Sequence, residues 1–304
     1  MARRYGGFTV LGLCSALIVS AAGCQPGVGT SSGGRIVQIG STKAIYIGLP
    51  AEFRALHPAL EECFGGQVRF SAQPNGVALG QQLEQGGIAY AIMSAGEYAA
   101  VENPEKLTLL ATGLNSLGKP ASKALFVVKA KSHVKSIADC AGKRFAFGTH
   151  GDILTDLAAQ RALEEAGVPV KKLLPELVPP PLAFDGRLYL KNDVPKVIIT
   201  DLTVNAGVLD EITYNGMPET GGNVITGPSR DQFEIVGETV EVPGIVFVAG
   251  PAADPTDVNK LKDFLINHAK DKQKVCEQLG VTGFAPPDKS AYDAVRSFVS
   301  KPGG

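Results

Sequence analysis

Apolar positions follow two periodicities that alternate along the chain from about residue 43 to residue 299. Short runs such as residues 124–128 are rich in β-branched and aromatic side chains, which favours buried strands. Residues 153–166 instead repeat apolar side chains every three or four positions and stop at Gly167, which predicts a helix. Because strand and helix signals alternate, the sequence indicates an α/β fold of layered sheets and helices.

The predicted strands cover residues 43–49, 67–72, 89–93, 108–112, 124–128, 144–147, 204–209, 234–236 and 244–249. The predicted helices cover residues 52–63, 77–85, 135–141, 153–166, 257–268, 271–279 and 291–299. Residues 197–200 fit either a strand or the end of a helix, and residues 216–230 predict a loop. The run Pro179-Pro180-Pro181 prevents regular structure around it.

The N-terminus carries an export signal. Arg3 and Arg4 precede an uncharged, apolar stretch at residues 8–22, which is too short to span a bilayer comfortably. Small residues then lead to Cys24, as in the bacterial lipobox, where cleavage exposes a cysteine that receives lipid through its sulfur. We therefore predict a lipoprotein signal peptide at residues 1–23 and a membrane anchor at Cys24. The alternative is an ordinary cleaved signal followed by a chance cysteine, and the Arg3-Arg4 pair also leaves open a twin-arginine export signal.

The stretch after Cys24 is rich in Gly and Ser, so residues 24–42 predict a flexible tether. The remaining chain exceeds the usual size of one core, which favours two lobes. A formal net charge of −1 without a basic stripe disfavours nucleic-acid binding. No second apolar run is long enough to cross a membrane.

Catalytic and metal-binding motifs are missing from the sequence. There is no nucleophile elbow, zinc-protease helix, phosphate-binding Walker loop or dinucleotide fingerprint, so we expect no enzyme. Cys63, Cys140 and Cys276 are not spaced as metal ligands, and a metal site at His150 and Asp152 would need further ligands that the sequence does not offer, so we expect neither a metal nor a cofactor. Beyond the signal and the anchor, Cys63, Cys140 and Cys276 remain. They allow one disulfide with one thiol or three buried thiols.

Four stretches together resemble the phosphate/phosphite/phosphonate-type substrate-binding proteins of ABC transporters, in the type II periplasmic-binding-protein superfamily. They are the turn at residues 93–98, the longer run at 126–148, the Asn-Ala-Gly-Val-Leu-Asp segment at 205–210, and residues 242–249 with the C-terminal tail. The resemblance extends from about residue 43 to residue 299.

The resemblance implies a two-lobed fold, with a mixed β-sheet flanked by helices in each lobe and a hinge of two crossing segments. Lobe 1 would combine residues 43–126 with 244–304, and lobe 2 would contain residues 127–243. It also implies an exported solute-binding protein that closes around a small polar ligand, phosphonate-like or zwitterionic, and presents it to a membrane permease. The alternative is a two-lobed lipoprotein that has lost solute binding and serves as a protein-interaction or sensory module.

Loops that enter helices are the expected ligand contacts, because a helix N-terminus offers unpaired N–H groups and partial positive charge. Glycines at 76, 96, 148 and 151 would allow a ligand to approach the backbone. Ser94 could instead cap its helix, and Tyr98 could instead pack on its lobe. The candidate residues are Asn75, Ser94, Tyr98, Thr149, His150, Asp152, Thr155 and Asn205.

Asp152 departs from the family pattern. Phosphonate binders usually place Ser and Thr directly after the glycine of this loop, whereas here the residues are Thr149, His150, Gly151 and Asp152. A carboxylate at this point would cap the helix and repel a dianion. Either Asp152 is a structural cap beside a neutral or singly charged ligand, or His150 and Asp152 contact a cationic or zwitterionic ligand.

Overall fold

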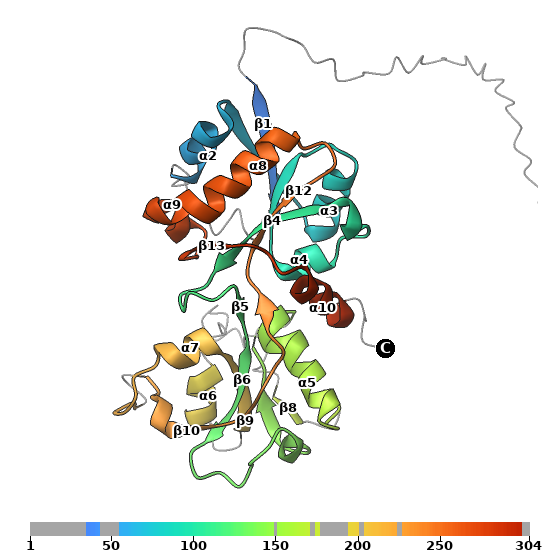
Figure 1. Ribbon diagram of the computed structural model, residues 1–304. Coiled ribbons are helices and arrows are strands. Elements are labelled where there is room, and N and C mark those ends of the chain that lie inside the picture. Colours follow the sequence, from blue (N-terminus) through green and yellow to red (C-terminus); the bar gives the residue numbers. More distant parts are fainter. Residues whose placement is uncertain are drawn as a thin grey trace, which may run out of the picture. The chain divides into compact units, whose positions relative to one another are not determined.

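The computed structural model describes residues 35–42, 55–148, 151–170, 174–176, 194–200, 204–223 and 227–299 (Figure 1). The predicted signal peptide, Cys24, the predicted strand at 43–49 and the proline run at 179–181 lie outside the described residues. Thr149 and His150 also lie outside them.

A mixed six-stranded sheet organises the first lobe. Its strand order is β13-β4-β12-β3-β1-β2, in which β1, β2 and β3 are parallel and β12 is antiparallel to β3 and β4. The strands are β1 (Ile36–Thr42), β2 (Gln67–Gln73), β3 (Tyr90–Met93), β4 (Thr108–Leu114), β12 (Val246–Ala249) and β13 (Gly283–Ala285). Most of these strands coincide with the predicted ones, but β1 and β13 were not predicted.

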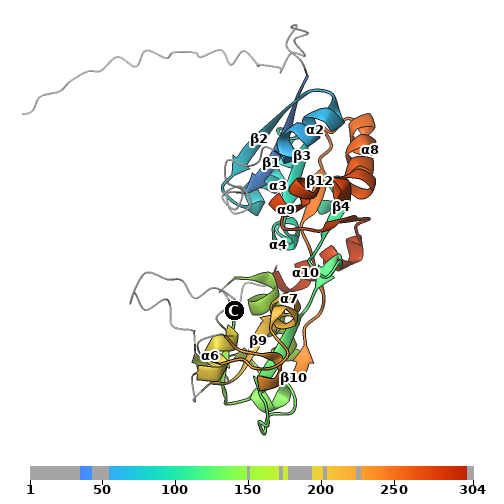
Figure 2. The ribbon, with the colours of Figure 1, turned by 90° about the vertical axis from the view of Figure 1, so that its left-hand side faces the viewer.

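Strand β1 occupies part of the stretch that was predicted to be a flexible tether. Residues 36–42 do not belong to a flexible linker: they form an inner strand between β2 and β3 (Figure 2). Val37 and Ile39 point into the core, because side chains on a strand alternate between its faces. The predicted tether, which ran to residue 42, is therefore wrong over its last seven residues.

Helices cover both faces of this sheet (Figure 1). Side chains of β3 alternate between the two layers: Tyr90 and Ile92 join one core cluster, and Ala91 and Met93 join the other. The first cluster lies under α2 (Leu56–Phe64), α8 (Pro255–Asp263) and α9 (Gln273–Gln278), and the second under α3 (Gly76–Glu84), α4 (Ala95–Ala99) and α10 (Lys289–Val299).

A five-stranded sheet organises the second lobe, with the order β10-β6-β9-β7-β8. Strand β6 is buried on both faces: Phe126 and Val128 pack beside α5, whereas Leu125 and Val127 pack beside α6. The elements are β6 (Ala124–Lys129), β7 (Arg144–Ala146), β8 (Leu174–Glu176), β9 (Val204–Asp210), β10 (Phe233–Glu238), α5 (Ala159–Glu165), α6 (Val194–Thr200) and α7 (Glu211–Gly216).

Some local predictions differ from the structure. The helix expected at 135–141 is only a 3-10 turn, Ala138–Cys140. The ambiguous segment 197–200 belongs to helix α6. The helix expected at 153–166 begins as a π-helical segment, Ile153–Ala158, which continues into α5. The helix expected at 257–268 likewise ends in a π-helical segment, Phe264–His268.

Two segments connect the sheets. Strands β5 (Ala121–Ser122) and β11 (Val242–Pro243) pair with each other as a small antiparallel ladder. Residues before β5 belong to the six-stranded sheet, and β6 belongs wholly to the five-stranded sheet. The lobe boundary expected between residues 126 and 127 falls inside β6. The chain instead passes from the first lobe to the second before residue 124, where β6 begins. A two-segment connection of this kind is the hinge that the fold requires.

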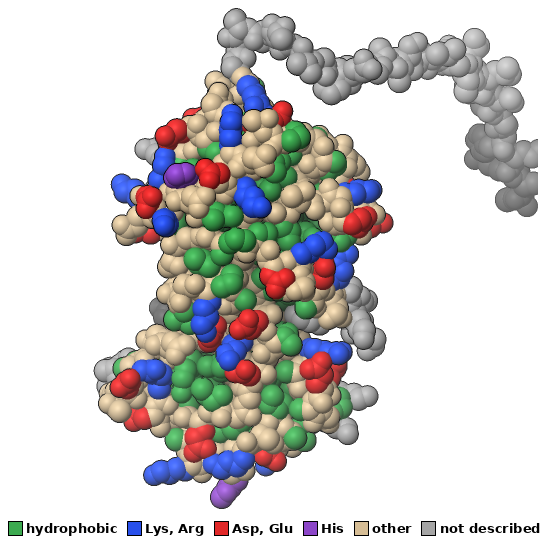
Figure 3. Space-filling model, in the orientation of Figure 1, with side chains coloured by type: hydrophobic (Ala, Val, Ile, Leu, Met, Phe, Trp, Pro, Cys, Tyr) green, Lys and Arg blue, Asp and Glu red, His purple; other side chains and the backbone are tan. Residues whose placement is uncertain are grey.

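The surface carries no dominant charge on the face shown in Figure 3, where acidic and basic side chains are interspersed. Within the described ranges, no helix is both long and apolar enough to cross a membrane.

Candidate ligand-binding site

The carboxyl ends of three parallel strands form one edge of the first lobe. Strand β1 ends at Thr42, β2 leads to Asn75, and β3 leads to Ser94. Helices α3 and α4 start next to each other at this edge. The backbones approach so closely that a Cβ atom added to Gly76 would lie 2.8 Å from the Cα atom of Glu97. The structure thus brings Asn75 and Ser94 to the same edge of the first lobe.

Both of these residues cap their own helices. The Asn75 side-chain oxygen accepts a hydrogen bond from the Ala78 N–H at 2.9 Å. Ser94 forms a capping box: its hydroxyl accepts from the Glu97 N–H at 3.3 Å, and the Glu97 carboxylate accepts from the Ser94 N–H at 2.7 Å. The capping role that the sequence suggested for Ser94 is therefore confirmed.

Ser41 and Thr42 lie at the same edge and were not among the candidate residues. Both are buried, and neither hydroxyl has a hydrogen-bond partner among the described residues. A buried hydroxyl without a partner is uncommon, so the pair stands out as a place where another polar group could bind. The alternation of Val37 and Ile39 was the available signal, but the preceding Gly/Ser run obscured it.

Tyr98 lies in the core of the first lobe. Its side chain has no exposed surface, and its ring packs edge-on against Tyr292 of α10, with 5.5 Å between the ring centroids. Burial raises the pKa of the Tyr98 hydroxyl, and the Lys289 ammonium on α10 opposes this effect. In this arrangement Tyr98 is a packing residue and offers a solute no surface.

Asp152 caps the helix that begins the second half of the candidate site. One of its oxygens, Oδ1, accepts three hydrogen bonds: from the Leu154 N–H at 3.1 Å, the Thr155 N–H at 2.7 Å and the Thr155 hydroxyl at 2.8 Å. The donors that an anion would use at this N-terminus are therefore already bound to the protein's own carboxylate.

Further carboxylates lie at this edge of the second lobe. Asp156 is buried and accepts from the Gly151 N–H at 2.7 Å. Asp210, also buried, ends β9 and accepts from the Thr213 N–H at 2.7 Å. Strands β7 and β9 are parallel, so Asp210 lies at the same edge as the loop that leads from β7 to Asp152. Neither Asp156 nor Asp210 was a candidate residue, although Asp156 lies in the first turn of the helix that begins at Ile153 and Asp210 caps α7.

Asn205 is not brought to this edge. It is exposed near the amino end of β9, where the neighbouring residue Val204 pairs with Arg144 at the amino end of β7. The structure therefore separates Asn205 from Asp152 along the strand direction.

Three of the glycines expected to let a ligand approach the backbone are instead approached by other residues of the protein. Atoms of Glu97 lie close to Gly76, atoms of Ile153 to Gly96, and atoms of Thr155 to Gly148.

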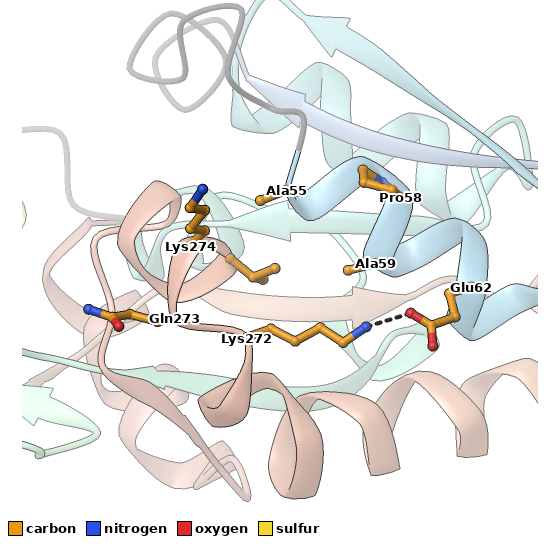
Figure 4. A pocket seen from close by; sticks show the side chains of 8 residues that line it. Ala55, Pro58, Ala59, Glu62, Lys272, Gln273 and Lys274 are labelled. Atoms are coloured by element: carbon orange, nitrogen blue, oxygen red, sulfur yellow. Dashed lines mark hydrogen bonds and ion pairs between the residues drawn. The ribbon is translucent and has the colours of Figure 1, made fainter.

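A pocket of about 460 Å³ lies elsewhere on the first lobe, between α2 and α9. Figure 4 shows the Lys272 side chain extending to the Glu62 carboxylate, and this contact lowers the pKa of Glu62. Ala59 and Val275 add apolar surface to the lining. No candidate residue lines this pocket.

The described part of the chain contains three cysteines, and none of them forms a disulfide. Cys63, Cys140 and Cys276 are all free thiols, so the alternative with a disulfide is wrong; Cys140 and Cys276 are buried as expected, whereas Cys63 is only half-buried. Burial raises the pKa of Cys140 to about 11, so its thiol is neutral near pH 7. Among the described residues, no three His, Cys, Asp or Glu side chains are grouped to hold a metal ion.

Two mixed α/β lobes and a two-segment hinge are the fold of the type II periplasmic binding proteins. The family model for the phosphonate periplasmic substrate-binding proteins of ABC transporters matches residues 49–292. The chain therefore belongs to this family, whose members bind solutes outside the cytoplasm for an ABC transporter and are not enzymes.

Solved structures share the fold at low sequence identity. The protein XAC2383 of Xanthomonas citri, bound to ATP, has 17% identity and a TM-score of 0.62, covering 87% of this chain and 97% of that one. PhnD1 of Prochlorococcus marinus, in complex with methylphosphonate, has 14% identity and a TM-score of 0.55, covering 86% and 96%. A binding protein of an ABC phosphonate transporter from Pseudomonas aeruginosa has 15% identity and a TM-score of 0.53, covering 87% and 85%.

Proposed function

We propose that this chain is a lipid-anchored receptor that delivers a small zwitterionic solute to an ABC uptake permease. The solute lies between the lobes, at the edge where Asn75, Ser94 and Asp152 begin their helices. The proposal rests on one observation: a single carboxylate oxygen of Asp152 already accepts hydrogen bonds from three donors at this helix start.

The charge at this edge supports a zwitterion over a dianionic phosphonate. The edge of the second lobe carries three carboxylates, those of Asp152, Asp156 and Asp210. The start of α4 in the first lobe carries a fourth, that of Glu97. A dianion placed among them meets like charges, which disfavour its binding. A solute with an ammonium group is attracted by the same carboxylates.

The first lobe supplies complementary polar groups. Ser41 and Thr42 hold buried hydroxyls without partners among the described residues. A hydroxyl can both donate and accept, so this pair suits the carboxylate or the ammonium of a zwitterion. Thr149 and His150, outside the described residues, remain proposed contacts of the solute.

A thermal-shift panel on the purified chain tests the solute class. At about 100 times its dissociation constant, a true ligand adds about 2.7 kcal/mol to the free energy of unfolding, or roughly 5–10 °C in Tm. Zwitterionic amino acids and betaines are expected to give such a shift, whereas phosphate and methylphosphonate are not. A shift with methylphosphonate alone contradicts the zwitterion. No shift with any solute favours the protein-interaction alternative.

The anchor rests on Cys24 and is tested separately. Lipid on Cys24 is expected to hold the chain in the membrane fraction, and Cys24→Ala is expected to release it. Cys63→Ala, which changes another cysteine, is the matched control and should stay in the membrane. If the Cys24→Ala chain also remains in the membrane fraction, the anchor lies elsewhere.

A further inference from the structure

The helix that begins the second half of the site touches the first lobe directly. Ile153, its first residue, lies against Gly96 in α4: a Cβ atom added to Gly96 would be 2.6 Å from Ile153 Cδ1 and 2.8 Å from Cγ1. Any side chain at position 96 would have to displace Ile153. The absence of a side chain at Gly96 is therefore what lets the two elements meet.

Two neighbours extend this contact into both cores. Ala158, which is buried, belongs to the core cluster of the first lobe that contains Tyr98 and Tyr292. Leu154 packs against that cluster and also against the core cluster of the second lobe. One helical turn therefore joins the apolar layers of both lobes.

Helix α10 completes the surface that receives this turn. Tyr292 packs against Tyr98, and its hydroxyl donates to the Gly244 carbonyl at 3.0 Å. Gly244 directly follows β11, one of the two hinge segments. The receiving surface is thereby fixed to the hinge as well as to the first lobe.

We propose that Ile153 and Gly96 form a latch that holds the two lobes together through protein contacts alone. Apolar surface shared by the two lobes stabilises the arrangement in which they touch, because separating them at this point would return that surface to water. Ile153 is thus a positioning residue: it sets how firmly the two lobes are held together before any solute binds. This inference goes beyond the proposed function and does not depend on which solute binds.

Hydrogen–deuterium exchange on the full chain in detergent, without added solute, tests the latch. Ile153→Ala is expected to speed exchange in residues 151–160 and also in residues 94–101 of the other lobe, by about threefold or more. Gly96→Val is expected to speed exchange in residues 151–160 by displacing Ile153. The informative signal is the exchange in the lobe that does not carry the substitution.

Leu157→Ala is the matched control, since Leu157 is a half-buried aliphatic residue of the same helical turn that joins neither core cluster. It should change exchange in residues 151–160 only. Unchanged exchange across the lobes in both Ile153→Ala and Gly96→Val would overturn the latch. Because no solute is added, a negative solute panel leaves this result intact, and a failed latch leaves the solute proposal intact.

Discussion

The two helix starts at the candidate site solve the same electrostatic problem differently. At α4, a serine and a glutamate exchange hydrogen bonds, so the donors are shared between two side chains. At the helix beginning with Ile153, a single oxygen of Asp152 accepts three hydrogen bonds. The first arrangement is a common capping box, whereas the second places a whole carboxylate where an anionic ligand could otherwise bind.

The difference shows where the ligand preference of this chain would be decided. Helix α4 has five residues, so its N-terminus adds little field of its own. The second-lobe helix continues from Ile153 into α5 and has the stronger dipole. Asp152 neutralises that stronger end, and under the proposed function the choice between anion and zwitterion depends mainly on this residue.

Removing the Asp152 carboxylate should have the largest effect on stability. Asp152→Ala leaves two backbone donors and the buried Thr155 hydroxyl without their acceptor. We expect the free energy of unfolding to fall by about 2–3 kcal/mol, combining a lost cap with an unsatisfied buried hydroxyl. Urea unfolding followed by circular dichroism measures it. A loss below about 0.5 kcal/mol would contradict the threefold role of this oxygen.

Alkaline pH should weaken the second lobe through Cys140. Its folded pKa is raised from 9.0 to about 11 by burial, so the thiol stays protonated in the folded chain while the unfolded chain loses its proton. Stability is therefore complete below pH 9 and falls as the pH rises towards 11, by on the order of 2 kcal/mol. Urea unfolding at pH 8 and pH 10.5 should show a smaller loss in Cys140→Ala. An equal loss in both chains would exclude Cys140 as the cause.

Removing the serine cap of α4 should have the smallest effect of the three. Ser94→Ala deprives the Glu97 N–H of its acceptor, but the Glu97 carboxylate still accepts from the backbone N–H at position 94. We expect a loss of about 1 kcal/mol, measured as for Asp152→Ala. A loss as large as that of Asp152→Ala would remove the distinction between the two helix starts.

The layered α/β fold could be predicted from the sequence because long elements carry strong periodicity. The helix at α3 and the strands β2 and β6 lie where the pattern placed them. Short elements such as β8 and β13, with three residues each, contain too few positions to show a period. Strand β1 was not predicted, because its polar end at Ser41 and Thr42 resembles a linker in sequence although both side chains are buried.

The candidate site was predictable only in part. Capping residues are visible in sequence, because Asn75, Ser94 and Asp152 each directly precede their helices. The burial of Tyr98 depends on Tyr292, which arrives from the far end of the chain, and local pattern cannot reveal it. Strand pairing likewise decides that Asn205 lies away from the edge that Asp210 occupies.

Titration of methylphosphonate into the wild-type chain and into Asp152→Ser tests the central claim most directly. Serine keeps a capping hydroxyl and removes the negative charge, so the helix start is retained. We predict that calorimetry will detect binding at least about tenfold tighter in Asp152→Ser than in the wild type, equivalent to about 1.4 kcal/mol. Equal affinities, or tight binding of methylphosphonate by the wild-type chain, would contradict the role of Asp152 as the protein's own anion at this site.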